Sequence, residues 1–288
     1  MIQELIPLAG KTTMRIGGKA QYFAELTTRD DVEAAWAFAM EKDVPLIVLG
    51  NGANTIFADE VIQALVVRIK TEKVEMMGNT VTVEAGKNLA MLINELAKHG
   101  LDLSPLTGIP GTIGGAIFGN AGQGPKGVWM DSFIEDVTVF EGNEWRVFGH
   151  EHCDFGYRES IFKHGPDHAP IIWEATLRIP SGDQAAIEAN VQNLLQKRIE
   201  TQPHLKTAGS CFKAVGETPA WKLIDAAGLR GSKIGGVQIA EKHANFLLNV
   251  EQATYADAKA IVQHVKAAVN EPLDVEMRFV EADGSLAF

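Results

Sequence analysis

The stretch Leu106-Thr-Gly-Ile-Pro-Gly-Thr-Ile-Gly-Gly-Ala-Ile-Phe-Gly-Asn-Ala-Gly122 is the most informative part of this sequence, because six glycines fall within residues 108–122. Glycine has no Cβ, so the backbone can approach a ligand closely and present successive N–H groups to a pyrophosphate. The spacing matches neither the Rossmann pattern G-x-G-x-x-G nor the phosphate-loop pattern G-x-x-x-x-G-K-[ST]. The stretch therefore predicts a nucleotide cradle of another kind.

A second run of small residues, Gly50-Asn-Gly-Ala-Asn-Thr55, follows an expected strand and is the other candidate for this cradle. The isolated pair Gly17 and Gly18 is interpreted, on its own, as a tight turn. Both glycine-rich segments follow predicted strands or turns, and the backbone N–H groups of such segments can form a concave donor surface for a pyrophosphate.

The charge balance excludes several classes of partner. The chain has 26 Lys plus Arg against 37 Asp plus Glu, a net charge of -11, so it repels nucleic acid and acidic membranes. No apolar run approaches the roughly eighteen residues of a membrane span, and residues 1–10 lack the cationic start of a signal peptide. The two cysteines, Cys153 and Cys211, show no metal or redox spacing. We therefore expect a cytoplasmic protein that binds neither nucleic acid nor membrane.

Periodicity predicts a mixed succession of helices and strands. Helices are expected over 31–43, from 89 to before Gly100, around 187–195, from 218 to 227 with Thr218 as cap, and from 254 to 269. Strands are expected over 45–49, 64–69, 80–84, 134–140, 144–148, 171–179, 246–250 and 274–280. A polar break between Pro180 and His204 predicts a domain boundary.

Seven stretches, in order along nearly the whole chain, resemble the UDP-N-acetylenolpyruvoylglucosamine reductase family. They are TTMRIGG (12–18), LGNGAN (49–54), TGIPGTIGGAIFGNAG (107–122), FGYRESIFK (155–163), AGSCFK (208–213), residues 234–249 and LDVEMRF (273–279). The resemblance implies an α+β fold: a two-lobed FAD-binding domain of the vanillyl-alcohol-oxidase (PCMH) type, residues 1–182 with lobes of about 1–60 and 61–182, and a C-terminal α/β substrate-binding domain, residues 183–288.

The resemblance also implies the cofactors FAD and NADPH. The residues it assigns to the FAD cradle are Gly50, Asn51, Gly52, Ala53, Asn54, Thr55, Gly108, Pro110, Gly111, Thr112, Gly114, Gly115, Asn120 and Ala121. Ala53 stands where the family usually has Ser, so one side-chain hydrogen bond is expected to be absent while backbone donors remain.

Reduction of an enol ether, the reaction the resemblance implies, needs a clamp for the substrate carboxylate and an acid for its α carbon. Arg158 resembles the family's clamp and Ser210 its proton donor. Cys211 is the rival donor, but adjacent side chains of an extended segment point in opposite directions. Glu276 resembles the glutamate that assists the clamp. Apolar and charged residues alternate along this expected strand, so Glu276 and Arg278 share one face, which is directed either at a cleft or at solvent.

The remaining family positions concern the substrate, a UDP-sugar. Tyr157, Lys213, His243 and Arg278 are the expected contacts. Ala214 follows Lys213 where the family commonly has Asn, which puts one contact in doubt. Nothing resembles the extra tyrosine-bearing loop of the longer family type, so the shorter type matches better.

Other interpretations stay open at this point. His150, His152, Cys153, His164 and His168 show no recognised zinc spacing, so no metal is expected. The expected function is NADPH-dependent reduction of UDP-N-acetylglucosamine enolpyruvate to UDP-N-acetylmuramate in peptidoglycan synthesis, by a monomer. The alternatives are a related FAD oxidoreductase with another substrate and a flavin- or UDP-sugar-binding protein without turnover.

Overall fold

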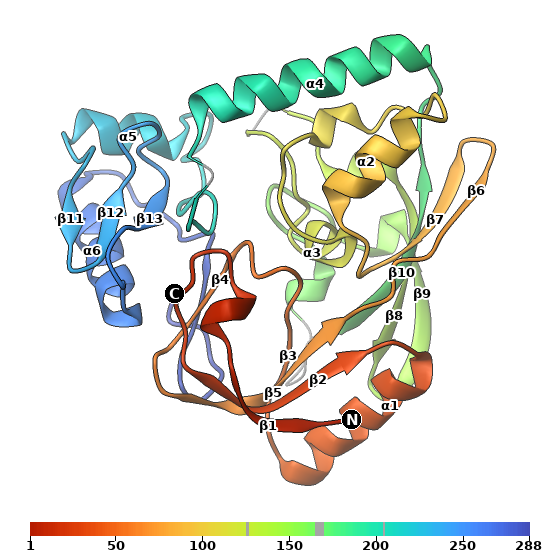
Figure 1. The fold of residues 1–288 in the computed structure, drawn as a ribbon, viewed down its shortest axis with the longest axis horizontal. Coiled ribbons are helices and arrows are strands. Elements are labelled where there is room, and N and C mark those ends of the chain that lie inside the picture. Colours follow the sequence, from red (N-terminus) through yellow and green to blue (C-terminus); the bar gives the residue numbers. More distant parts are fainter. Residues whose placement is uncertain (125–126, 165–169, 204) are drawn as a thin grey trace.

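The computed structural model describes residues 1–124, 127–164, 170–203 and 205–288. Its first sheet has the order β1-β2-β5-β3 and lies in the lower part of Figure 1. The sheet contains β1 (Gln3–Pro7), β2 (Lys19–Leu26), β3 (Leu46–Val48) and β5 (Val61–Ile69), and α1 (Arg29–Lys42) packs on it. β1 is antiparallel to β2, whereas β5 runs parallel to both β2 and β3.

The second sheet is wholly antiparallel and has the order β6-β7-β10-β8-β9. Its strands are β6 (Val74–Met77), β7 (Thr80–Glu84), β8 (Ile134–Glu141), β9 (Glu144–Gly149) and β10 (Ile171–Arg178), and it carries α2 (Leu89–Ala97) and α3 (Ile113–Phe118). β8 and β9 pair as an antiparallel hairpin, and its two turn residues, Gly142 and Asn143, both have positive φ.

The last part of the chain forms a small three-stranded sheet between two helices. Its elements are α5 (Ala220–Ala226), β11 (Lys233–Ile234), β12 (Val237–Ile239), β13 (Leu247–Asn249) and α6 (Tyr255–Ala268). α4 (Gln184–Thr201) runs from the second sheet's side of the molecule to this part, as Figure 1 shows. The 3-10 turns are Ala9–Lys11, Ser104–Leu106, Met130–Phe133, His150–His152 and Ile161–Lys163.

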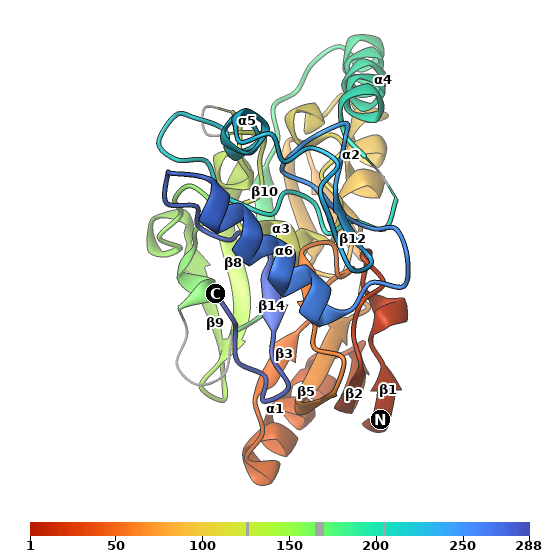
Figure 2. The same ribbon diagram turned by 90° about the vertical axis from the view of Figure 1, so that its left-hand side faces the viewer.

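The last strand of the chain pairs with a strand from its first quarter. After α6, β14 (Arg278–Val280) pairs in parallel with β4 (Thr55–Phe57), and Figure 2 shows β14 below α6 and close to the first sheet. The terminal strand is shorter than the predicted 274–280, because before Arg278 only Val275 makes a bridge, to Phe212, and no continuous ladder forms. This pairing places the C-terminal strand beside the residues that directly follow the glycine turn at residues 50–54.

Local capping explains where several helices begin. Thr28 and Asp31 form a capping box at α1, Thr254 and Asp257 form one at α6, and the Asp183 side chain caps α4. The prediction of Thr218 as cap for α5 is wrong, since Pro219 occupies the cap position and the helix begins at Ala220. These caps fix the N-terminal ends of α1, α4 and α6.

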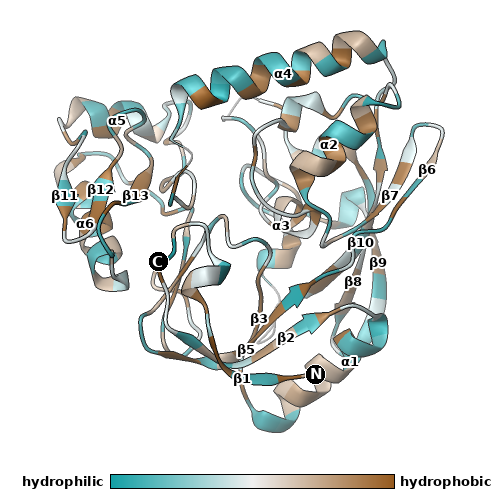
Figure 3. Ribbon diagram, viewed as in Figure 1, coloured by the Kyte–Doolittle hydropathy of each residue, from teal (hydrophilic) through white to brown (hydrophobic). Residues whose placement is uncertain are grey.

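The buried side chains form three hydrophobic clusters. One is shared by residues 8–66 and 208–280, a second fills the space between the second sheet, α2 and α3, and a third lies under α1. Figure 3 shows hydrophobic residues concentrated on the strands, while α4 alternates between hydrophilic and hydrophobic residues along its length. The division into residues 1–182 and 183–288 stays a prediction.

Candidate active site

The turn after β3 presents an uninterrupted row of backbone donors. Among the described residues, none accepts a hydrogen bond from the N–H groups of residues 50–54. The Gly52 carbonyl, by contrast, accepts bonds from the Thr13 backbone (3.0 Å) and the Thr13 hydroxyl (3.2 Å), so the turn is fixed from behind. Such a row of N–H groups suits an anion with several oxygens.

The backbone around residue 52 leaves no room for any residue other than glycine. The φ of Gly52 is +64°, and a Cβ there would lie 2.5 Å from the Lys11 carbonyl oxygen and 2.7 Å from the Thr12 Cα. Gly50 lies against the second glycine-rich segment, since its Cβ would lie 2.8 Å from the Thr112 hydroxyl. The two glycine-rich segments therefore meet, as the family resemblance implies.

The second segment leaves open space at one glycine. Gly111 has a φ of +123°, and no atom lies within 4 Å of its ideal Cβ position. Thr112 then caps α3 by accepting a hydrogen bond from the Gly115 N–H, and Gly114 packs on Ala85. Free amides on one segment and an open glycine on the other fit a pyrophosphate held by backbone, which is what an FAD cradle requires.

Asn120 connects the cradle to the loop that carries Arg158. It is fully buried, its amide nitrogen donates to the Gly156 carbonyl (2.9 Å), and its amide oxygen accepts from the Asp131 N–H (3.0 Å). Its role as a cofactor contact stays a prediction, since the structure occupies its side chain with these backbone bonds.

Arg158 has a strained backbone conformation, and one nitrogen of its guanidinium group has no hydrogen-bond partner among the described residues. Its φ is +59°, and the Lys163 ammonium donates to its carbonyl. Its Nε donates to Glu276 Oε1 (2.8 Å) and its Nη2 to the Gly122 carbonyl (2.8 Å). Its Nη1 is buried and has no hydrogen-bond partner among the described residues. A buried, unpaired N–H group of this kind is suited to an anionic oxygen of a ligand.

Glu276 faces the interior of the site rather than solvent. It forms the ion pair with Arg158, and the two side chains are only 18% and 14% exposed. Burial raises the pKa of the Glu276 carboxyl, although the neighbouring Arg158 acts in the opposite direction. The backbone around it is fixed at both ends, because its carbonyl accepts from the Asn54 amide (3.1 Å) and its N–H donates to the Cys211 carbonyl (2.8 Å).

Ser210 lies between the cradle and the C-terminal part. It is half-buried and forms an isolated bridge with Phe246, and the Cβ position of the preceding Gly209 is 3.8 Å from the Ala53 carbonyl oxygen. Cys211 points the other way, as expected, into the shared hydrophobic cluster, and burial raises the pKa of its thiol. A thiol so placed is a poor proton donor for this site.

The expected substrate contacts gather around the same ion pair. Lys213 Nζ donates to Glu159 Oε1 (2.6 Å), beside Arg158, and the Tyr157 hydroxyl accepts from the Ala214 N–H (3.2 Å). The Arg278 guanidinium lies 5.0 Å from the Phe118 ring centroid, and burial lowers the pKa of Arg278. His243 packs against Phe246, the bridge partner of Ser210.

The sequence motifs do not reveal Arg198. It extends from α4 over the glycine-rich segment, where its Cδ lies 2.3 Å from the Cβ position of Gly108, and its Nη1 donates to the Thr107 carbonyl (3.3 Å). Burial first, and the charge of Arg158 second, lower its pKa to about 10. A helical arginine shortly before the break at Gln202-Pro203 is the signal in the sequence that points to it.

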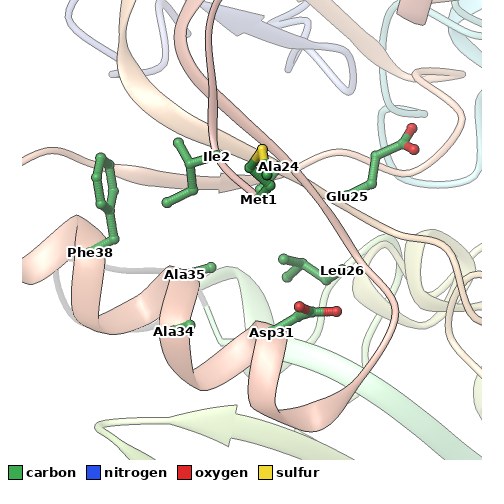
Figure 4. Close-up of a pocket in the computed structure, with 9 residues that line it drawn as sticks. All are labelled: Met1, Ile2, Ala24, Glu25, Leu26, Asp31, Ala34, Ala35 and Phe38. Atoms are coloured by element: carbon green, nitrogen blue, oxygen red, sulfur yellow. The ribbon is translucent and has the colours of Figure 1, made fainter.

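Two other features stand apart from this site. His164 contacts Glu159 (3.2 Å), His168 lies outside the described residues, and within residues that are described no three His, Cys, Asp or Glu side chains come together as a metal site. Figure 4 shows a pocket lined by the first two residues of the chain, the end of β2 and α1. Of the nine residues that Figure 4 labels there, the charged side chains, Glu25 and Asp31, are carboxylates, which are unsuited to a phosphate.

Comparisons with known proteins define the class first. A model of FAD-binding domains matches residues 20–143, and a model of the UDP-N-acetylenolpyruvoylglucosamine reductase C-terminal domain matches residues 202–279. A UDP-N-acetylenolpyruvoylglucosamine reductase of Levilactobacillus brevis is 36% identical over 95% of this chain and 91% of its own length. The chain therefore belongs to the UDP-N-acetylenolpyruvoylglucosamine reductase family.

Solved structures agree with this assignment. The crystal structure of UDP-N-acetylenolpyruvylglucosamine reductase from Thermus caldophilus covers 97% of this chain and 98% of its own, with a TM-score of 0.85 and 30% identity. A Physcomitrella patens BBE-like 1 structure (TM-score 0.50, 17% identity, 62% of this chain and 42% of its own) shares the fold alone. The fold is α+β, with an FAD-binding domain of the vanillyl-alcohol-oxidase type and the family's C-terminal domain. Of the helices in the described ranges, none is long and apolar enough to cross a membrane.

Proposed function

We propose that this chain reduces UDP-N-acetylglucosamine enolpyruvate to UDP-N-acetylmuramate with NADPH, a step of peptidoglycan synthesis. The observation that carries the proposal is the buried, unpaired Nη1 of Arg158 beside Glu276, next to a row of free backbone amides suited to FAD. When bound, FAD accepts hydride from NADPH and supplies it to the β carbon of the enolpyruvyl group. All remaining steps fall to side chains of this chain.

The cradle proposed for FAD is built mainly from backbone. The N–H groups of residues 50–54 supply donors for the pyrophosphate, and Gly111 leaves room for a ligand beside the start of α3. The other predicted cradle residues belong to the same two segments, so we keep the full predicted set as part of this proposal.

Arg158 is the proposed clamp for the substrate carboxylate. Hydride addition to the β carbon places negative charge on the α carbon and the carboxylate, and a guanidinium fixed by Glu276 and the Gly122 carbonyl stabilises that charge without moving. The free Nη1 is the group that bonds the substrate. Glu276 therefore acts by orienting Arg158 and by sharing the charge of the intermediate.

Ser210 is the proposed acid that protonates the α carbon. Ser210 directly follows Gly209, whose Cβ position lies 3.8 Å from the Ala53 carbonyl oxygen, and it bridges to Phe246 of the C-terminal part. A hydroxyl is a weak acid, but a basic enolate held against it accepts the proton readily. Cys211 is excluded from this role by its burial in the core.

The diphosphate of the substrate is assigned to the cations around Arg158. Arg198 and Lys213 reach the site from α4 and from the segment after Ser210, and Tyr157, His243 and Arg278 complete the proposed substrate contacts. We further propose a monomer, since all three catalytic side chains come from one chain, and a cytoplasmic location, to which the two free cysteines are suited.

The experiment that tests this function follows the colour of the purified protein. A yellow preparation should bleach with NADPH and regain its colour anaerobically when the enolpyruvyl sugar is added. A protein that fails to take up FAD, or whose reduced form is not reoxidised by the sugar, would overturn the proposal.

A further inference from the structure

Thr13 bonds both the glycine turn at residues 50–54 and the segment that carries Ser210. Its backbone N–H donates to the Gly52 carbonyl (3.0 Å), and its hydroxyl lies 2.6 Å from the Thr207 carbonyl. The hydroxyl also reaches the Gly52 carbonyl (3.2 Å), but it carries a single proton, and the shorter distance gives Thr207 the larger share. Thr13 therefore holds the cradle with its backbone and residues 207–211, the proton-donor segment, with its side chain.

We propose that Thr13 is a positioning residue that fixes the distance between the flavin and the proton donor Ser210. The inference rests on the proposed function, because it takes Ser210 as the acid and FAD as the hydride donor. It names a residue outside the predicted cradle and outside the three catalytic side chains.

The proton-donor segment is held at its two ends by different parts of the chain. At its end, the Cys211 N–H donates to the Asn245 carbonyl (2.8 Å), which attaches the segment to the C-terminal part. At its start, the Thr207 carbonyl accepts the hydroxyl proton from the N-terminal part. Gly209, with a φ of +81°, lies between these ends, and a glycine permits several backbone conformations. The position of Ser210 relative to the cradle therefore depends on both attachments.

A second connection runs beside the first. Asn249 is buried, its amide nitrogen donates to the Met14 carbonyl (3.0 Å), and its N–H donates to the Lys206 carbonyl (3.0 Å). Asn249 thus attaches Lys206 to the N-terminal part but leaves the Thr207 carbonyl to Thr13. Loss of the Thr13 hydroxyl should therefore displace the proton-donor segment without unfolding this region.

Proton delivery is the step that such a displacement affects most. A general acid must lie within hydrogen-bond distance of the atom that it protonates, and a misplacement of about 1 Å can cost roughly 10²-fold in rate. Thr13→Val places a methyl group at the position of the hydroxyl, 2.6 Å from the Thr207 carbonyl oxygen. Because carbon and oxygen need a separation of about 3.3 Å or more, the substitution moves Thr207 away from the cradle, and Ser210 with it.

The test measures the two half-reactions of the FAD-loaded protein by stopped-flow absorbance. In Thr13→Val, reoxidation at saturating enolpyruvyl sugar should slow between about tenfold and 10²-fold, and the half-saturating sugar concentration should stay within about twofold of the wild type. Reduction by NADPH and the ratio of flavin to protein should not change, because the Thr13 N–H still bonds Gly52. Thr13→Ser keeps the hydroxyl and should reoxidise within about threefold of the wild type.

Thr12→Val is the matched control. The Thr12 hydroxyl lies 3.3 Å from the carbonyls of Ala9 and Ile16, within its own loop, so both half-reactions should stay within about twofold of the wild type. A double variant tests whether Thr13 acts through Ser210. Adding Thr13→Val to Ser210→Ala should slow reoxidation by less than about twofold beyond Ser210→Ala alone.

Three results would overturn the inference: wild-type reoxidation in Thr13→Val, full additivity with Ser210→Ala, or a loss of flavin and of NADPH reduction that matches the loss of reoxidation. The last result would mean that the hydroxyl only stabilises the cradle. If Ser210→Ala itself is reoxidised at the wild-type rate, the assignment of the acid fails instead.

A second measurement does not depend on turnover. Amide hydrogen exchange over residues 205–211 should be faster in Thr13→Val than in the wild type or in Thr12→Val. Thr13→Ala, which removes the hydroxyl without adding a methyl group in its place, should show the same change if Thr13→Val does not fold. Unchanged exchange overturns the inference. Faster exchange in a protein that the sugar does not reoxidise means that Thr13 holds the segment and that only the proposed reaction fails.

Discussion

The FAD cradle and the reaction centre are built in opposite ways. The cradle consists of backbone groups from two short glycine-rich segments, with the N–H groups of residues 50–54 as its donors. The reaction centre consists of side chains, and its central ion pair joins Arg158 to Glu276 across 118 positions of sequence. The difference implies that the cradle should tolerate changes of side chain but not of backbone, while the reaction centre should fail when single functional groups are removed.

Among the substitutions that test this comparison, Ser210→Ala is expected to have the largest effect. Removing the proposed acid should slow reoxidation of the reduced protein by the enolpyruvyl sugar at least about 10³-fold, the scale of a positioned general acid. Reduction by NADPH should keep its wild-type rate, because it does not need that proton. Stopped-flow absorbance of the two half-reactions measures both rates.

Cys211→Ala is the control for this pair of measurements. The thiol is buried in the core, so its removal should lower thermal stability slightly and leave reoxidation within about threefold of the wild type. Unchanged turnover in Ser210→Ala, or a large loss of reoxidation in Cys211→Ala, would show that the proton comes from another group.

The backbone character of the cradle is tested by Gly52→Ala against Gly78→Ala. Both glycines have a φ of +64°, but a Cβ at Gly52 would clash with Lys11 and Thr12, whereas a Cβ at Gly78 would meet no atom within 4 Å. Gly78→Ala should cost only the roughly 1 kcal/mol of a left-handed non-glycine residue. Gly52→Ala should cost about 3 kcal/mol or more and lose bound flavin, because the strain adds to a backbone shift.

Thermal unfolding and the ratio of flavin to protein absorbance compare these two variants. Equal stability and equal flavin content would mean that the shape of the turn at residues 50–54 is not what holds FAD.

Arg158→Lys probes the reaction centre with the positive charge kept. An ammonium cannot keep the geometry of bonds to Glu276 and the Gly122 carbonyl while also offering a third N–H group to the substrate. We expect kcat/KM for the enolpyruvyl sugar to fall about 10²-fold, the effect of losing one preorganised donor. Arg178→Lys, at the exposed ion pair with Glu135, is the control and should leave kcat/KM unchanged. A wild-type value for Arg158→Lys would contradict the proposed role of the Arg158 Nη1 group.

The same contrast explains what the sequence can and cannot predict. Glycine spacing is local, so it predicts that residues 108–122 form a phosphate cradle, whereas only the family resemblance implies that residues 50–55 belong to the same cradle. The structure places Gly50 against Thr112. Whether Glu276 faces solvent could not be decided from alternation, because the answer depends on Arg158, far away in the chain. Arg198 belongs to no glycine pattern, and its place over Gly108 results from the packing of α4.

The sequence patterns do not predict β1 and β2, for a related reason. β1 and β2 pair with each other and are held by the close approach of Gly18 to the backbone of Asp59 and Glu60, a contact that a local turn interpretation of Gly17 and Gly18 does not contain. The terminal strand was predicted too long because alternation continues through residues 274–277, where the structure has a single bridge, from Val275 to Phe212, instead of a ladder. Contacts distant in sequence decided both cases.

The smallest expected effect, in Ala53→Ser, measures how far the cradle depends on backbone alone. Ala53 stands where the family usually has Ser, and its backbone N–H is among the donors free of described partners. If backbone amides supply most of the binding, a new hydroxyl can add at most one ordinary hydrogen bond, about 0.5–1.5 kcal/mol. The FAD dissociation constant, measured by fluorescence as FAD is added back to apoprotein, should fall between about twofold and tenfold. A change beyond 100-fold would mean that a side chain dominates the cradle, and the contrast with the reaction centre would no longer hold.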